Sequence, residues 1–285
     1  MSGYAFHAAK DLREAAAMLA ETCALAYIVA GGTDVMLEIR DGKHPPGLLL
    51  DISRLNELRG IEEKDGEIHI GALTTIRELA ESPIIAKSAP ALHDAALRFA
   101  DPSTRNRATI GGNIVNASPG ADGLPPLYAL DARVALFSRD GERELAAWEF
   151  ITGPQKTAIG DGEILTGITI RPCRNSAFVK MGLRRAMAIA METVAVALET
   201  GDGGMVTSCR VAYGALGPTP LRGHETEKAL TGKIPCRELL DEAAEAARRD
   251  IRPRDGLRGT REYRLGTVGV ILRRAFEIAY GRAGT

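Results

Sequence analysis

Two short stretches of the sequence combine adjacent glycines with small polar residues. Residues 28–37 read IVAGGTDVML, and residues 108–113 read ATIGGN. Glycine has no Cβ, so paired glycines allow the backbone to approach a ligand closely. Successive backbone N–H groups in such a turn form a concavity that binds anions. These residue types therefore indicate phosphate binding by the backbone rather than acid–base catalysis by side chains.

The first stretch has the pattern of a buried strand, a glycine turn and the start of a helix. A helix N-terminus adds unpaired N–H groups and a partial positive charge, and both suit a phosphate. A glycine turn between a strand and a helix is often only a turn, and this alternative remains open for the stretch taken alone. The sequence contains neither the dinucleotide fingerprint G-x-G-x-x-G at this turn nor the phosphate loop G-x-x-x-x-G-K-[ST].

The second stretch belongs to residues 105–123, RNRATIGGNIVNASPGADG, which show no clear helix or strand pattern. Asn113, Asn116 and Ser118 offer donors and acceptors, and the Asp122 carboxylate can accept from a sugar hydroxyl. The simple alternative is an irregular connection, but loops of this length inside a compact domain are more often functional. Two such loops on separate units predict a long ligand with phosphates in its middle, and a dinucleotide fits.

Other chemistries find little support in the sequence. The five histidines and four cysteines, among them Cys23, are not spaced as metal or iron–sulfur ligands. A net charge of −1 and a pI near 6.6 do not indicate binding to nucleic acid or to a membrane. The N-terminus lacks a signal-peptide pattern, and the most apolar run, AMAIAMETVAVALE, is too short to span a bilayer. We therefore expect a cytoplasmic protein.

The elements that must position the glycine stretches divide the chain into three parts. Residues 1–55 show strand, helix and strand patterns typical of a small parallel βαβ unit, with a helix over 9–21 and a second one capped by Thr33 or Asp34. Residues 56–173 have an α+β pattern of largely antiparallel character, including a helix that Pro83 ends and a helical stretch over 84–100. Residues 174–285 begin with two strands around the turn GDGG and end in helices. The run before that turn is also compatible with a buried helix, but we predict a strand.

In their order and separation, the two glycine stretches resemble the FAD-binding subunit of molybdenum hydroxylases. This is the family of the xanthine dehydrogenase and carbon monoxide dehydrogenase flavoproteins. The similarity covers essentially the whole chain and includes residues 150–170, 178–199 and 209–222. Residues 253–265, PRDGLRGTREYRL, are particularly similar to the bacterial xanthine dehydrogenase subunit.

The resemblance implies an α+β fold: a two-subdomain FAD-binding domain of the PCMH or vanillyl-alcohol-oxidase type, then an α+β C-terminal domain with an antiparallel sheet and helices. It also implies the FAD-contacting residues. These are Tyr27, Ile28, Val29, Ala30, Gly31, Gly32, Thr33, Asp34, Phe99, Thr109, Ile110, Gly111, Gly112, Asn113, Asp122, Leu165 and Lys180.

Roles follow from the same resemblance. The N–H groups of both glycine pairs would hold the pyrophosphate. Asp122 would accept from ribose or ribityl hydroxyls, and Phe99 and Leu165 would flank the flavin or the adenine. Lys180 would lie near the isoalloxazine, where positive charge favours the reduced flavin. Taken without the resemblance, Phe99 has the pattern of a core residue and Lys180 that of a solvated charge.

The implied function is electron transfer rather than substrate chemistry. A molybdopterin-binding large subunit would oxidise the substrate, a [2Fe–2S] small subunit would relay electrons, and FAD here would pass them to NAD⁺ or another acceptor. No catalytic residue and no metal ligand is assigned to this chain. Two alternatives remain: a free-standing flavin-dependent oxidoreductase, with His93 as the nearest candidate for a covalent flavin link, and an assembly module without FAD.

We expect the arginine-rich residues 248–265 to form a solvated loop and helix start, although contact with a partner subunit is also compatible with them.

Overall fold

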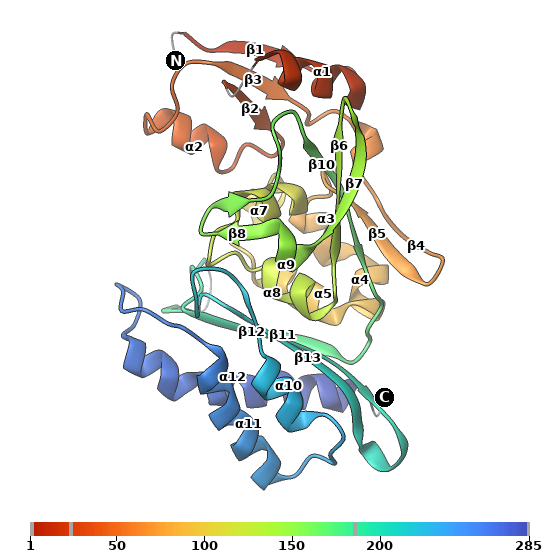
Figure 1. Ribbon diagram of the computed structural model, residues 1–285, viewed down its shortest axis with the longest axis vertical. Helices are drawn as coiled ribbons and strands as arrows, with labels where there is room; N and C mark the ends of the chain where they lie inside the picture. The colour runs from red at the N-terminus through yellow and green to blue at the C-terminus, as the bar shows by residue number, and fades with distance from the viewer. Residues whose placement is uncertain (1–2, 23–24, 185–186, 284–285) are drawn as a thin grey trace.

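The computed structural model describes residues 3–22, 25–184 and 187–283. Three sheets follow one another along the long axis of the molecule, each with helices against it (Figure 1). The N-terminal sheet lies at one end, a five-stranded sheet lies in the middle, and the C-terminal sheet with its helices lies at the other end. This mixed arrangement confirms the predicted α+β fold class.

The N-terminal unit is a three-stranded parallel sheet in the order β1-β3-β2. Its strands are β1 (Ala5–Ala8), β2 (Ala26–Val29) and β3 (Leu48–Asp51), and its helices are α1 (Leu12–Thr22) and α2 (Val35–Arg40). The predicted βαβ unit is therefore present, and β1 adds a strand that the sequence patterns did not reveal. Asp34 occupies the N-cap position of α2, although its side chain forms no capping hydrogen bond.

The middle unit is built on an antiparallel sheet in the order β4-β5-β10-β6-β7. The strands are β4 (Ile61–Lys64), β5 (Glu67–Gly71), β10 (Ile164–Ile170), β6 (Arg133–Ser138) and β7 (Gly141–Ala146). A short pair, β8 (Ile151–Gly153) with β9 (Lys156–Thr157), lies beside it. Buried side chains of the sheet pack against the helices of this unit to form one core, which includes Ile68, Leu79, Leu92 and Leu127.

The prolines of the middle unit begin helices as well as ending them. The helices here are α3 (Ile76–Glu81), α4 (Pro83–Ser88) and α5 (Pro90–Arg98). Pro83 does end the preceding helix, as predicted, but the single helical stretch expected over 84–100 is two helices, each opened by a proline. The first helical position suits proline, because its missing N–H would have no partner inside the helix there.

The prediction that residues 105–123 lack regular structure is wrong. They contain the end of α6 (Pro102–Arg105) and the whole of α7 (Ile110–Asn116), and α8 (Leu124–Ala129) follows. Two glycines weaken a helix, but Thr109 caps α7 by accepting from the Gly112 N–H at 3.1 Å. The left-handed Ala117, at φ 47°, ends the helix. Capping and tertiary contacts therefore outweigh the low helix propensity.

The C-terminal unit is an antiparallel sheet in the order β11-β12-β13-β14, covered on one face by helices. Its elements are β11 (Ser176–Met181), β12 (Glu192–Thr200), β13 (Val206–Gly214), β14 (Leu221–Arg222), α10 (His224–Leu230), α11 (Arg237–Asp250) and α12 (Arg261–Arg282). The strand prediction for the run before GDGG is confirmed. Phe178, Ala195 and Ala212 on the other face belong to the core of the middle unit, so the two units share buried surface.

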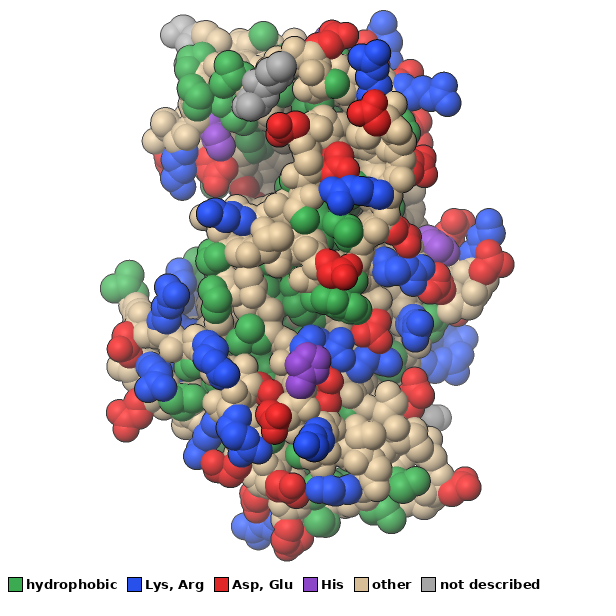
Figure 2. Space-filling view, in the orientation of Figure 1, with side chains coloured by type: hydrophobic (Ala, Val, Ile, Leu, Met, Phe, Trp, Pro, Cys, Tyr) green, Lys and Arg blue, Asp and Glu red, His purple; other side chains and the backbone are tan. Residues whose placement is uncertain are grey.

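The outer surface agrees with the near-neutral composition. Basic and acidic side chains are interspersed over the face shown in Figure 2. In the part of the chain that the structure covers, no helix is both long and apolar enough to cross a membrane.

Candidate functional site

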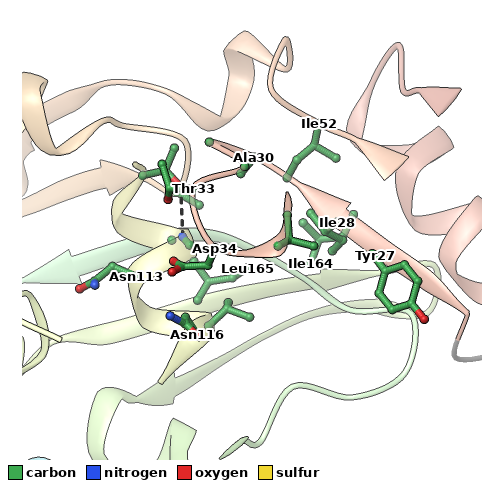
Figure 3. A pocket seen from close by; sticks show the side chains of 18 of the residues that line it. Tyr27, Ile28, Ala30, Thr33, Asp34, Ile52, Asn113, Asn116, Ile164 and Leu165 are labelled. Atoms are coloured by element: carbon green, nitrogen blue, oxygen red, sulfur yellow. Dashed lines mark hydrogen bonds between the residues drawn. The ribbon is translucent and has the colours of Figure 1, made fainter. Parts of the chain in front are cut away.

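A cavity of about 1440 Å³ opens between the N-terminal unit and the middle unit. Its walls come from β2, the turn into α2, the start of α7 and the residues leading into β10 (Figure 3). Pockets for small ligands usually measure about 300–1,000 Å³, so this cavity has room for a larger molecule such as a dinucleotide.

The turn between β2 and α2 presents free backbone donors to this cavity. Gly31, Gly32, Thr33 and Asp34 all line it. Within the described residues, none of their four N–H groups donates a hydrogen bond to the protein. A buried N–H group without a partner is unfavourable, so a run of free donors facing a cavity is a place for an anionic acceptor. The turn fits a pyrophosphate.

Different constraints require glycine at the two positions of this turn. A Cβ on Gly31 would lie 2.0 Å from the Arg107 carbonyl oxygen, so the β2–α2 turn and the chain before α7 touch through this residue. The Arg107 Nε donates back to the Gly31 carbonyl oxygen at 3.2 Å. Gly32 has φ +71°, a left-handed conformation that side chains disfavour. Gly31 therefore permits contact between two protein segments, and Gly32 permits the turn itself.

The N-terminus of α7 does not offer free donors. Ile110 N–H donates to the Thr74 carbonyl oxygen at 3.0 Å and Gly111 N–H to that of Ala72 at 2.9 Å. Gly112 and Asn113 N–H groups donate to the side chain and carbonyl of Thr109. We predicted that both glycine pairs supply N–H groups to a phosphate. In the described residues, only the first pair has N–H groups without protein acceptors, and phosphate binding by that pair stays a prediction.

The second glycine pair contributes in other ways. A Cβ on Gly111 would lie 2.7 Å from the Ala72 carbonyl oxygen. This glycine therefore permits close packing of α7 against Ala72, the residue that follows β5. A Cβ on Gly112 would meet only Thr109 Oγ1, at 3.0 Å, and Gly112 lines the cavity. The Asn113 and Asn116 side chains also line it, on the α7 side in Figure 3. Their amide groups can donate to a ligand.

One end of the cavity is lined by two aromatic rings and an acidic side chain. Tyr27 and His44 have ring centroids 4.6 Å apart, and the Tyr27 hydroxyl donates to the Pro45 carbonyl oxygen at 3.0 Å. His44 Nε2 lies 3.0 Å from Glu38 Oε2. Burial, together with nearby Glu38, raises the pKa of Asp34. Glu38 and His44 line the cavity and were not predicted from the sequence, although the four-residue spacing from Asp34 places Glu38 on the same side of α2.

The other end is bounded by α7 and the residues after α5. Phe99, Ala100, Val115 and Asn116 line it. Figure 3 shows Tyr27 on one side of the view, and Thr33, Asp34, Asn113 and Asn116 together on the other side. The cavity therefore has two distinct ends, one at Tyr27 and the other at α7.

Asp122 and Lys180 form a buried ion pair beside this second end. Lys180 Nζ lies 2.5 Å from Asp122 Oδ2 and also donates to the Arg98 carbonyl oxygen at 3.4 Å. Asp122 Oδ1 is buried and has no hydrogen-bond partner among the described residues. Burial raises the pKa of Asp122 to about 6, against the opposing effect of Lys180. The pair connects β11 of the C-terminal unit to the middle unit.

Most of the predicted FAD-contacting residues line the cavity, and four do not. Val29 does not line the cavity although its neighbours Ile28 and Ala30 do, and Ile110 is fully buried in the core of the middle unit. Asp122 and Lys180 contact each other. The lining residues are Tyr27, Ile28, Ala30, Gly31, Gly32, Thr33, Asp34, Phe99, Thr109, Gly111, Gly112, Asn113 and Leu165.

The folding pattern and the cavity together define a protein that holds a dinucleotide between two subdomains. Comparison with known families identifies it further. Residues 2–172 match the FAD-binding domain of molybdopterin dehydrogenases, and residues 177–279 match the C-terminal domain of carbon monoxide dehydrogenase flavoproteins. The chain belongs to this family of FAD-binding medium subunits, and FAD is its cofactor.

Relatives resemble the chain over nearly its whole length. The xanthine dehydrogenase FAD-binding subunit of Escherichia coli O157:H7 is 33% identical, with 98% of this chain and 97% of the relative covered. The carbon monoxide dehydrogenase medium chain of Hydrogenophaga pseudoflava is 31% identical, with 98% of each covered. Among solved structures, reconstituted carbon monoxide dehydrogenase from Oligotropha carboxidovorans has a chain that matches with a TM-score of 0.94 at 33% identity, again over 98% of each chain.

The contact at Gly31 predicts a specific defect. Gly31→Ala places a methyl group against the Arg107 carbonyl, and because backbone must move, we expect a loss of about 1–3 kcal/mol in the free energy of unfolding and weaker FAD binding. Gly256→Ala is the matched control, because Gly256 has no atom within 4 Å of the added Cβ. Urea denaturation and FAD titration of both variants measure this. Equal behaviour of the two variants would show that the segments are not in tight contact.

The raised pKa of Asp122 predicts a pH dependence of stability. Because the folded protein holds this proton up to about pH 6, whereas an unfolded aspartate releases it near pH 4, stability should fall as the pH rises from about 4 to 6. The expected fall is up to about 3 kcal/mol. In the variant Asp122→Asn, urea denaturation at about pH 4 and about pH 6 should not show this fall in the free energy of unfolding. An identical pH dependence in both proteins would contradict the assignment.

Proposed function

We propose that this chain is the electron-transfer flavoprotein subunit of a heteromeric molybdenum hydroxylase of the xanthine dehydrogenase type. In such a complex it receives electrons from [2Fe–2S] clusters of a small subunit and delivers them to NAD⁺ or another acceptor. A molybdopterin-binding large subunit oxidises the substrate. The complex works in the cytoplasm, and the chain divides into functional parts at residues 1–55, 56–173 and 174–285.

The N–H groups of residues 31–34, which have no acceptor among the described residues and belong to the wall of a cavity large enough for a dinucleotide, carry this proposal. They are suited to the pyrophosphate, because hydrogen bonds to a charged acceptor are stronger than those between neutral groups. When bound, FAD supplies a carrier that exchanges electrons singly with iron–sulfur clusters and in pairs with a nicotinamide. The protein holds this carrier and shields it from water.

The two ends of the cavity differ in a way that sets the direction of the cofactor. Tyr27 and His44 provide ring surfaces for a base, and Glu38 can accept from hydroxyls of the ribose. A carboxylate next to the flavin ring would oppose its reduction, so the Glu38 end suits the adenosine. The opposite end lies beside the Asp122–Lys180 ion pair, in which the two charges balance, so no unpaired carboxylate opposes reduction there. We therefore assign the adenosine to the Tyr27 end and the isoalloxazine to the Phe99 end.

The relatives support a role as one subunit among several. They are named as FAD-binding subunits and medium chains, and this chain matches them over nearly their full length. In the described part of the chain, no three His, Cys, Asp or Glu side chains are grouped as metal ligands. We propose that the iron–sulfur and molybdenum centres of the complex belong to the partner subunits.

The alternative of a free-standing flavin-dependent oxidoreductase has less support. His93, its nearest candidate for a covalent flavin link, has Nε2 3.0 Å from the Ala80 carbonyl oxygen and does not line the cavity. Purification of the chain with iron–sulfur and molybdenum subunits would favour the complex, and purification of an active chain alone would favour the alternative.

The visible spectrum tests the proposed electron transfer. The purified chain loaded with FAD should show flavin bands that NADH bleaches in the absence of oxygen, if NAD⁺ is the acceptor of the complex. Without partner subunits, hypoxanthine should leave the bands unchanged, because substrate oxidation belongs to the molybdenum subunit. Purine turnover by the isolated chain would contradict the proposal.

The direction of the cofactor predicts a difference between FAD and FMN. Tyr27→Ala removes a ring that stacks on the base, an interaction worth about 1–3 kcal/mol, so the Kd of FAD should rise about 5- to 150-fold. FMN lacks the adenosine, and its Kd should change less than about twofold. Tyr263→Ala, at an exposed tyrosine of α12, is the control. Equal weakening of FAD and FMN by Tyr27→Ala would show that the assignment of the two ends is wrong.

A further inference from the structure

Arg105 lies directly behind the wall of the cavity at its Phe99 end. It is the last residue of α6, it is half-buried, and its side chain does not line the cavity. Arg105 Nη1 donates to the Phe99 carbonyl oxygen at 2.7 Å and to the Ala100 carbonyl oxygen at 3.3 Å. Both of these residues do line the cavity. One guanidinium group therefore binds the backbone of two successive wall residues.

The backbone that Arg105 holds is in an unfavourable conformation. Ala100 has φ +37°, a value that residues with a Cβ adopt only rarely. Such a conformation persists only where surrounding contacts enforce it, and such sites cluster at ligand-binding positions. The turn at Ala100 ends α5 and sets the direction of Phe99, which is the C-cap residue of that helix. The hydrogen bonds from Arg105 are the contacts that span this turn.

The position of Arg105 is itself fixed by the short helix that carries it. Asp101 caps α6, because its carboxylate accepts from Thr104 N–H at 3.0 Å and from Thr104 Oγ1 at 2.6 Å. These hydrogen bonds lower the pKa of Asp101 to about 2, so the cap is ionised at neutral pH. In the described chain, Arg105 forms no ion pair, so its charge is directed at the two carbonyl groups. Residues 99–105 thus form one hydrogen-bonded unit.

We propose that Arg105 is a positioning residue for the flavin: it holds the Phe99–Ala100 turn so that Phe99 lies against the isoalloxazine ring. The proposal rests on the function and the cofactor direction proposed above. Arg105 acts through Phe99 and does not touch the cofactor. Removal of the Arg105 side chain should therefore weaken flavin binding only in a protein that still has Phe99.

A double-mutant cycle tests this coupling in the full-length chain. Arg105→Met, Phe99→Leu and the double variant are titrated with FMN, which reports the flavin end without the adenosine. Coupled residues deviate from additivity. Arg105→Met should raise the Kd of FMN about tenfold relative to the wild type. In the Phe99→Leu background, the same substitution should raise it less than about twofold relative to Phe99→Leu alone. The visible circular dichroism of the bound flavin should change in Arg105→Met and should be partly restored in Arg105→Lys. Arg98→Met is the matched control, because the Arg98 side chain is exposed and forms no hydrogen bond in the described residues.

The possible outcomes test the positioning role of Arg105, which we call the Arg105 clamp, separately from the proposed function. If Arg105→Met and Phe99→Leu raise the Kd independently, Arg105 has only a structural role and the clamp is overturned, while the proposed function stands. If Phe99→Leu leaves FMN binding unchanged, the flavin end is assigned wrongly and the clamp is overturned with it. Failure of the wild-type chain to bind any flavin would overturn the proposed function as well. If Arg105→Met does not fold, the same cycle is measured with Arg105→Lys.

Discussion

The contact between Gly31 and the Arg107 carbonyl is the constraint on which the cofactor site depends. It brings the turn after β2 against the chain that enters α7, although the two segments belong to different units. The approach is possible only without a side chain at residue 31. Residues 31–34 line the cavity, and their N–H groups have no acceptor among the described residues. We therefore expect this packing of the protein on itself to create the proposed anion site.

The two glycine pairs look equivalent in the sequence and differ in the structure. The first supplies unpaired donors, whereas the second begins a helix whose donors are satisfied by Thr74, Ala72 and Thr109. In the second pair, Gly111 allows close packing and Gly112 leaves the cavity wall without a side chain. The polar groups that face the ligand from α7 are therefore the amides of Asn113 and Asn116, which are neutral. We therefore expect the β2–α2 turn to hold the phosphate charge and the start of α7 to shape the space around it.

Local patterns of the sequence predicted the α+β class and the glycine turns, whereas the family resemblance implied the two-subdomain arrangement and the remaining FAD-contacting residues. Alternating and continuous apolar runs predicted strands in each of the three units, although not β1, and the glycine pairs led us to predict where a phosphate would be held. The helix α7 was missed, because its stability comes from a cap and from tertiary hydrogen bonds that outweigh two glycines. Glu38 and His44 were missed for a similar reason. Their contact, and that of His44 with Tyr27, depends on the path of the chain after α2, which a local sequence pattern does not predict. The Asp122–Lys180 pair joins residues 58 positions apart, and its formation depends on how the C-terminal sheet packs against the middle unit.

A crystal structure of the chain with FAD bound tests the central claim most directly. The account predicts pyrophosphate oxygens within hydrogen-bond distance, about 2.7–3.2 Å, of at least two N–H groups among residues 31–34. It also predicts that the α7 N–H groups keep their protein partners. A pyrophosphate held by the N-terminus of α7, with the N–H groups of residues 31–34 left free, would contradict it.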